Sequence, residues 1–441
     1  MPISGTRHLG EIHTLRYLCP GKKFRTRTMP QINTTRLPNG LTLVHTQDTT
    51  TQMVATSVLY RVGAANEEPD HTGLAHLLEH LMFGGSENAP DFDKPLQQAC
   101  GENNAFTNAD RTHYYITLPA VNVETAFWLE SDRMTRLVLT PRTLEVQRNV
   151  VMEEFKLHYI NRPFGDLQHL LYKLVYEEGA YSWPTIGLHL SHIEEVSLQT
   201  VQDFYRRFYA PSNAILSVCG NISWERTQEL TERWFGPLVS SAPAPPPPAY
   251  STSETHSTRR LTVHRAVPND VLIIAWRTPN VFDPRIPAFD LASDLLVSGK
   301  SSRLYRSLVE QQRAALGVEA YIEPALGPGL FIVEALPAPG VSTEHLETAV
   351  REQVEQLLAQ PPSEQELEKV LNRLETALAA RRSSCHDVAM QLAWCVLLGD
   401  AELFNTELSR YRSVTPESLH HAVADTLSWQ HANVLHYKRQ T

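Results

Sequence analysis

Two histidines and a glutamate fall within five consecutive residues, His76-Leu77-Leu78-Glu79-His80. Histidines four positions apart project from one face of a helix, and neutral imidazole nitrogens are good zinc ligands. A catalytic zinc ion usually takes three protein ligands and keeps one position open for water. Glu79 can face that open position without being a ligand, and a carboxylate there can take a proton from water and pass it to a leaving amine. The pattern predicts a zinc site on a helix, with Glu79 as the general base of a hydrolytic reaction.

A third ligand has to come from another part of the chain, and residues 147–155 contain the best candidate. Apolar residues at helical spacing in this segment predict a helix with one buried side. Glu153 and Glu154 point to adjacent faces of that helix; Glu154 is preferred, although the spacing leaves both open. In the alternative interpretation, His76 and His80 are core histidines and the glutamates lie on a solvated face. The motif is specific enough to favour the metal site.

The elements that must position these side chains can be followed in the sequence. Asn39-Gly40 is a hairpin signal that precedes residues 41–44, and residues 54–62 form a second predicted strand. A polar loop then leads to the helix that carries the histidine motif. Further helices are expected at 123–137, 144–158, 198–208, 288–297, 343–358 and 363–380, and further strands at 215–218, 260–264, 271–277 and 329–333.

A proline-rich segment divides the chain into halves of similar size. Residues 239–258 combine prolines with serines and threonines, which favours an extended polyproline spacer. Both halves begin with the order strand, strand, polar loop, helix and glycine-containing turn, which indicates a diverged duplication. We expect an α+β fold with two similar domains, each a mixed or antiparallel sheet with helices packed on one side. The predicted parts are a basic extension at 1–29, a zinc-binding domain at 30–238, the linker at 239–258 and a domain without a metal site at 259–441.

The composition is that of a globular protein, with 42% hydrophobic and 20% charged residues in a chain of 441. A net charge of -10 argues against a nucleic-acid surface, which needs a concentrated basic face. No apolar run approaches the roughly 20 residues of a membrane span. Five scattered cysteines favour a reducing compartment over a disulfide framework. We expect a cytoplasmic protein, or one of the mitochondrial matrix if the basic residues 1–29 are a transit peptide.

Three stretches of the sequence together resemble one peptidase family. They are residues 73–85, which contain the histidine motif, residues 101–107 and residues 150–155. From Ile32 onwards the chain is similar to the pitrilysin-type (M16, subfamily B-like) zinc metallopeptidases. The similarity is greatest to half-length members such as mitochondrial processing peptidase subunits and bacterial peptidases split over two chains. The resemblance implies a single zinc ion held by His76, His80 and Glu154, with Glu79 as the general base.

The resemblance also implies a peptide-binding strand. Asn103, Asn104, Ala105 and Phe106 match the family's substrate-binding edge strand, which pairs with an extended peptide through main-chain hydrogen bonds. The expected activity is the cleavage of peptides or unfolded segments inside a closed chamber. Some members carry a further glutamate seven residues before the third ligand. Gln147 stands at that position in this chain, which weakens a role in orienting the ligands.

The second half departs from the family pattern at two positions. Active members carry an arginine and, seven residues later, a tyrosine, where this chain has Val309 and Leu316. Arg303 and Tyr305 are an alternative pair, but their spacing favours a packing role at the start of a helix. We therefore expect a homologous subunit without metal to supply the arginine and the tyrosine in a heterodimer, or otherwise a homodimer. The rival interpretation is a non-catalytic scaffold subunit of the same family.

Overall fold

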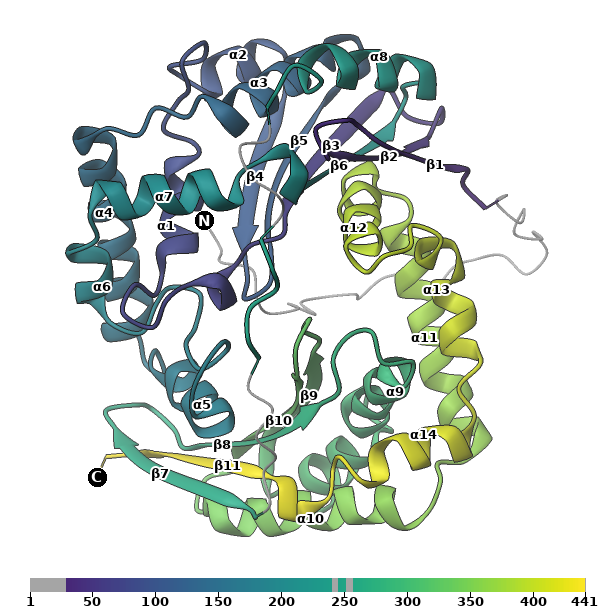
Figure 1. The fold of residues 1–441 in the computed structure, drawn as a ribbon. Helices are drawn as coiled ribbons and strands as arrows, with labels where there is room; N and C mark the ends of the chain where they lie inside the picture. The colour runs from purple at the N-terminus through teal and green to yellow at the C-terminus, as the bar shows by residue number, and fades with distance from the viewer. Residues whose placement is uncertain (1–28, 240–244, 251–256, 441) are drawn as a thin grey trace.

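The computed structural model describes residues 29–239, 245–250 and 257–440, which form two α+β halves with one sheet each (Figure 1). The first half contains strands β1 (Ile32–Arg36), β2 (Thr42–Gln47), β3 (Met53–Tyr60), β4 (Glu102–Thr107), β5 (Thr112–Pro119) and β6 (Ala214–Gly220). Its helices are α1 (Leu74–Leu81), α2 (Asp93–Gln98), α3 (Glu124–Thr135), α4 (Pro141–Phe155), α5 (Leu167–Tyr176), α6 (Leu190–Glu194), α7 (Leu198–Phe208) and α8 (Trp224–Trp234).

The second half has the same kind of construction. Its strands are β7 (Arg259–Arg265), β8 (Val271–Thr278), β9 (Ala315–Glu323), β10 (Gly329–Pro337) and β11 (Asn433–Arg439). Its helices are α9 (Ile286–Val297), α10 (Thr343–Ala359), α11 (Glu364–Arg381), α12 (Cys385–Leu397), α13 (Leu403–Arg412) and α14 (Pro416–Ala424). The predicted two-domain α+β fold class is confirmed.

The two sheets share one strand order. The order is β1-β2-β6-β3-β5-β4 in the first half and β7-β11-β8-β10-β9 in the second, so among the described strands the first sheet differs by the addition of β1. Each sheet has one parallel pair, formed by the first and last strands of the repeated unit: β2 with β6, and β7 with β11. The other pairs are antiparallel. A shared order with a shared parallel pair supports a duplicated unit. It also makes β4 and β9 equivalent edge strands.

The turn at Asn39-Gly40 joins β1 to β2 as the sequence predicts. Gly40 has a φ of 93°, a left-handed conformation that glycine adopts without steric cost, and its N–H donates to the carbonyl of Leu37 at 2.9 Å. The side chain of Asn39 donates to the carbonyl of Phe235 at 2.7 Å, just beyond α8. The turn therefore sets the β1–β2 register and ties it to a helix of the same half.

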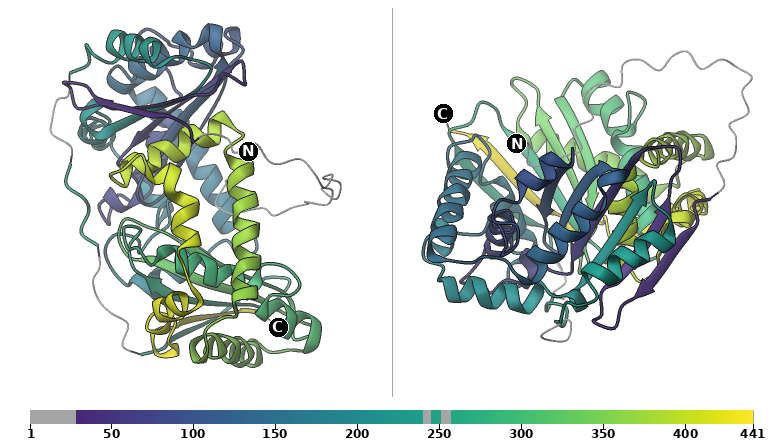
Figure 2. Two further views of the ribbon diagram at one scale, coloured as in Figure 1. Left: turned by 90° about the vertical axis from the view of Figure 1, so that its right-hand side faces the viewer. Right: turned by 90° about the horizontal axis from the view of Figure 1, so that it is seen from above.

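Each sheet is covered on both faces because each half lends a helix to the other. One face of the first sheet packs on its own helices, whereas the other face packs on α12, where Leu392 shares a cluster with Leu59 of β3. The second sheet in turn receives α5 of the first half, where Val175 shares a cluster with Ile332 of β10. Figure 1 shows α12 below the upper sheet, and helices α11 and α13 lead from it to the lower half; Figure 2 gives two further views of this arrangement. This exchange holds the two halves together.

Most predicted helices lie close to the observed ones. The helix expected at 144–158 ends at Phe155, and a π-helical turn follows at Lys156–Ile160. Residues 1–28 of the predicted extension, and 240–244 and 251–256 of the predicted linker, lie outside the described residues. None of the helices in the described ranges combines the length and the apolar character that a membrane span requires.

Candidate metal centre

Helix α1 presents the three polar side chains of the motif on one half-buried face. His76, Glu79 and His80 remain partly accessible. The other face of the helix is apolar and packs into the main core; it consists of Leu74, Ala75, Leu77, Leu78 and Leu81. Burial of this face sets the rotation of the helix about its axis. The packing that holds α1 therefore also aims the two imidazoles and the carboxylate.

A side chain from outside the helix caps the N-terminus of α1. Gly73 occupies the N-cap position with a φ of 88° and offers no capping side chain of its own. The carboxylate of Glu67 accepts hydrogen bonds from the N–H groups of Gly73 and Ala75, both at 2.8 Å, and from the indole of Trp183 at 3.0 Å. Burial raises the pKa of Glu67 to about 8, although these donors act to lower it. Glu67 could not be predicted from the sequence, because a capping side chain six residues before the N-cap has no short-range signature.

Helix α4 brings Glu154 to face α1. The helix begins where the side chain of Thr140 accepts the N–H of Thr143 at 3.2 Å. Glu153 points away from the histidines: its side chain is 73% exposed and pairs with Lys156 at 2.8 Å. Of the two glutamates that the sequence left open, the structure brings Glu154 to the motif.

Three donor atoms converge between α1 and α4. Nε2 of His76 and Nε2 of His80 are 3.3 Å apart, and Oε2 of Glu154 lies 3.3 Å from the second and 3.9 Å from the first. A tetrahedral zinc ion with bonds of about 2.1 Å places its ligand atoms roughly 3.4 Å apart, so these three atoms fit such an ion. Metal ions in proteins are bound mainly by histidine, cysteine, aspartate and glutamate side chains. In the described part of the chain, this is the one group of three or more of these side chains whose donor atoms all lie within 4.8 Å of one another.

The protonation states of these side chains suit metal ligands. Burial lowers the pKa of His76 to about 4, and the neighbouring His80 adds to this effect, so the His76 imidazole is neutral at pH 7. Burial acts to raise the pKa of Glu154, but the hydrogen bond with His80 and the charges of the two histidines outweigh it and lower that pKa. The site therefore offers a neutral imidazole and a carboxylate, as zinc requires.

Glu79 is placed beside the three donors without being one of them. Its Oε2 accepts a hydrogen bond from the hydroxyl of Thr107 at 2.5 Å. Burial raises the pKa of Glu79, although this hydrogen bond acts to lower it. A half-buried carboxylate of raised pKa, next to a candidate metal site, is suited to accept and release a proton. The contact between Thr107 and Glu79 could not be predicted from the sequence, because it joins a strand to a helix 28 positions away.

Strand β4 forms an edge of the first sheet, as the predicted peptide-binding strand requires. It pairs with β5 on one side, and no other described strand pairs with it. Ala105 packs toward the main core, and Phe106 stacks on His113 with ring centroids 4.8 Å apart. The side chain of Asn103 donates to Asp93 at 3.0 Å. Asn104 is exposed.

The other predicted positions lie on α4 and in the second half. Gln147 precedes Glu154 by two helical turns and is half-buried. Val309 packs against the core of the second half, whereas Leu316 on β9 is 55% exposed. Arg303 forms an ion pair of 3.0 Å with Glu366, which supports its packing role. Neither Val309 nor Leu316 can donate a hydrogen bond from its side chain.

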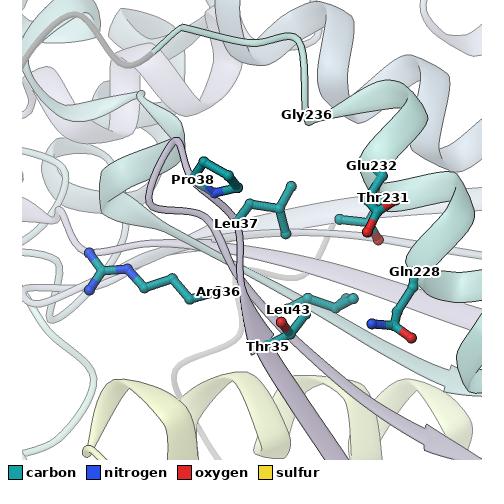
Figure 3. Close-up of a pocket in the computed structure, with 9 residues that line it drawn as sticks. All are labelled: Thr35, Arg36, Leu37, Pro38, Leu43, Gln228, Thr231, Glu232 and Gly236. Carbon is teal, nitrogen blue, oxygen red and sulfur yellow. The ribbon is translucent and has the colours of Figure 1, made fainter.

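A cavity of about 300 Å³ lies apart from these residues (Figure 3). It is formed between the β1–β2 turn, with Leu37 and Pro38, and helix α8, with Gln228 and Glu232. None of the residues that line it belongs to the motif or to α4. The cavity is therefore separate from the candidate metal centre, which α1, α4 and β4 form.

Two family models match the chain, one after the other. "Insulinase (Peptidase family M16)" matches residues 42–180, and "Peptidase M16 inactive domain" matches residues 195–374. The first match contains all four polar side chains of the candidate centre. This chain belongs to the M16 peptidase family. The second match lies mostly in the half that has no counterpart of the histidine motif.

Relatives in this family are named as zinc proteases. The zinc protease PqqE of Helicobacter pylori is 29% identical over 366 residues, which cover 82% of this chain and 82% of that protein. The uncharacterized zinc protease YmxG of Bacillus subtilis is 26% identical over 64% of this chain and 68% of its own length. These names agree with the donor set found between α1 and α4.

Solved structures share the fold over nearly the whole chain. A protease from Helicobacter pylori superimposes with a TM-score of 0.88 at 26% identity and covers 93% of this chain and 100% of its own. Pitrilysin and the periplasmic protease PqqL of Escherichia coli superimpose with TM-scores of 0.75 and 0.76 at 17% and 18% identity. This chain spans 45% and 47% of those two structures, about half of each.

Proposed function

We propose that this M16 chain is a zinc-dependent metalloendopeptidase, in which His76, His80 and Glu154 hold the metal and Glu79 is the general base. The observation that carries the proposal is the convergence of three donor atoms within 4.8 Å, with a second carboxylate, that of Glu79, beside them and outside the donor set. When bound, a zinc ion supplies Lewis acidity, which polarises a peptide carbonyl and makes water easier to deprotonate.

The residues of the chain supply the proton transfers. Glu79 takes a proton from the attacking water and later gives it to the nitrogen of the leaving amine. Its raised pKa suits both steps, because the carboxylate binds the proton more readily than an exposed glutamate does. Half-burial of Glu79 between α1 and β4 also limits its access to bulk water.

Strand β4 is the proposed peptide-binding element. Its open edge offers main-chain N–H and C=O groups to an extended peptide, with Asn103, Asn104, Ala105 and Phe106 along it. Thr107 at the end of the strand touches Glu79, so a peptide on this edge runs past the base. Main-chain pairing has little sequence selectivity, which fits peptides or unfolded segments as substrates within a closed chamber.

A partner subunit is proposed because of two residues in the second half. Val309 and Leu316 stand where active relatives carry an arginine and a tyrosine, so a homologous subunit without metal would supply that pair in a heterodimer, or otherwise a second copy in a homodimer. The relation to pitrilysin and PqqL supports this, because those chains have room for a second unit of similar size. Size-exclusion chromatography with and without the candidate partner tests it. Full peptidase activity of the purified chain alone would overturn the partner proposal.

The rival function is a non-catalytic scaffold subunit of the same family. The test combines zinc content by elemental analysis with cleavage of an internally quenched peptide by the wild type and by Glu79→Gln, each alone and with the partner. A peptidase should contain zinc in both forms and lose cleavage in the variant. A zinc-free protein without Glu79-dependent cleavage would favour the scaffold.

A further inference from the structure

The hydroxyl group of Thr107 makes the closest contact to the proposed base. Its Oγ1 donates to Oε2 of Glu79 at 2.5 Å, which is in the range of short hydrogen bonds between a hydroxyl and a carboxylate. Thr107 is the last residue of β4, the edge strand, whereas Glu79 belongs to α1. This hydrogen bond therefore joins the strand proposed to bind peptide to the helix that carries the base.

The surroundings of Thr107 favour this direction of donation. Thr112 lies directly opposite it in the β4–β5 register, and the two hydroxyl oxygens are 3.3 Å apart. Thr112 is fully buried and donates its own proton to the carbonyl of Val62 at 2.9 Å. The proton of Thr112 is thus engaged elsewhere, and the shortest contact of Thr107 is to the Glu79 carboxylate. The register of the two strands holds the Thr107 hydroxyl at that carboxylate.

We propose that Thr107 is a positioning residue for the general base and, through β4, links peptide binding to the orientation of that base. The hydrogen bond occupies Oε2 of Glu79, so Oε1 is the oxygen left to accept the proton of the attacking water. In this step an O–H bond of water breaks and its proton forms an O–H bond on Oε1. The water oxygen bonds to the carbonyl carbon, and the π electrons of the carbonyl group move onto the carbonyl oxygen. The inference rests on the proposed function of Glu79 as the base.

Two substitutions separate this role from simple packing. Thr107→Val keeps the branched shape that suits a strand but removes the hydroxyl, whereas Thr107→Ser keeps the hydroxyl and removes the methyl group. A packing role predicts that serine is the more harmful replacement. A positioning role predicts the reverse order. Thr56→Val is the matched control, since Thr56 is a buried threonine of β3 whose hydroxyl has no hydrogen-bond partner among the described residues.

The experiment measures kcat and KM on an internally quenched peptide, alone and with the candidate partner subunit, together with zinc content and the thermal midpoint, for wild type and each variant. Thr107→Val should lower kcat about 10- to 100-fold, because a displaced catalytic group costs rate rather than affinity. KM and zinc content should stay close to wild type, Thr107→Ser should recover most of kcat, and Thr56→Val should match wild type. In a Glu79→Gln background, Thr107→Val should have no further effect on the residual rate.

The outcomes distinguish this inference from the function on which it rests. A wild type that cleaves no faster than Glu79→Gln, both alone and with the candidate partner subunit, would overturn the proposed function and the role of Thr107 with it. Glu79-dependent cleavage in which Thr107→Val keeps the wild-type kcat, or in which the serine variant is as slow as the valine variant, would overturn the role of Thr107 alone.

Discussion

The carboxylate of Asp110 accepts the backbone N–H of Leu326 at 2.9 Å, across the boundary between the two halves. Its other oxygen accepts the hydroxyl of Tyr181 at 2.5 Å, and that hydroxyl accepts the N–H of Gly327 at 2.9 Å. A Cβ on Gly327 would lie 2.5 Å from the ring of Tyr250, so only glycine lets the turn of the second half approach. Asp110 belongs to the turn after β4, so this edge strand is anchored on the second half.

Replacing Asp110 with alanine should weaken the contact between the halves. The N–H of Leu326 and the hydroxyl of Tyr181 would lose their acceptor in a buried environment, which costs about 1–3 kcal/mol in the free energy of unfolding. Urea denaturation followed by tryptophan fluorescence measures the change. Asp203→Ala on the exposed face of α7 is the control and should stay within about 0.5 kcal/mol of wild type. Equal stability of the two variants would contradict the anchoring role.

The neighbouring glutamates of α4 allow a matched test of the metal ligands. Glu154→Gln should lose most of its zinc, because the amide oxygen carries no charge for the ion, whereas Glu153→Gln should keep it, since Glu153 pairs with Lys156 away from the histidines. Elemental analysis of both variants after dialysis against a weak chelator gives the answer. Zinc retained by Glu154→Gln, or lost by Glu153→Gln, would show that the ligand was assigned to the wrong residue.

Glu67 should support the metal helix from outside it. Glu67→Ala removes the acceptor for the N–H groups of Gly73 and Ala75, which should cost about 1–3 kcal/mol of stability. Zinc should also dissociate faster, because the helix that carries both histidine ligands loses its cap. Denaturation and the rate of zinc transfer to a chromophoric chelator measure these effects. Glu68→Ala, at the adjacent exposed position, is the control, and identical zinc transfer in the two variants would argue against the support.

Site residues that lie on one helix are easier to predict from the sequence than site residues that come from different elements. His76, Glu79 and His80 lie on one short helix, so their spacing alone places them on one face. Glu154 could not be separated from Glu153 in this way, because adjacent residues differ by about 100° around a helix and only the packing of α4 on α1 decides between them. Thr107 reaches Glu79 through strand pairing, which leaves no local pattern.

The fold shows the same division between local and long-range information. The Asn39-Gly40 turn and helix α7 could be predicted because turn chemistry and helical spacing are local. The exchange of helices could not, because the apolar face of α12, with Leu392, would suit the sheet of either half. The burial of Arg133 on α3 could not be predicted either. It pairs with Glu130 inside the core, where sequence patterns favour apolar residues.

The ion pair between Arg303 and Glu366 gives the protein a defined pH dependence. The hydrogen bond from Arg303 and the N–H of Ser363 lower the pKa of Glu366 to about 2, from an ordinary value of 4.5. The unfolded chain therefore takes up a proton at higher pH than the folded protein. The stabilisation is fully present above pH 4.5 and is lost as the pH falls toward 2. Since the Glu366 side chain is 37% exposed, solvent screening limits the contribution to about 0.5–1 kcal/mol.

Glu366→Gln removes this titrating group from the start of α11. The difference in unfolding free energy between wild type and variant should be largest near pH 6 and should shrink as the pH falls to 3, because the wild type loses its ion pair while the variant has none to lose. Urea denaturation at several pH values measures it. Glu364→Gln, at an exposed position in the same helical turn, is the control. If the difference in unfolding free energy for Glu366→Gln stayed constant with pH, Arg303 would not be paired with this carboxylate. Arg303 would then be available to act in the active site.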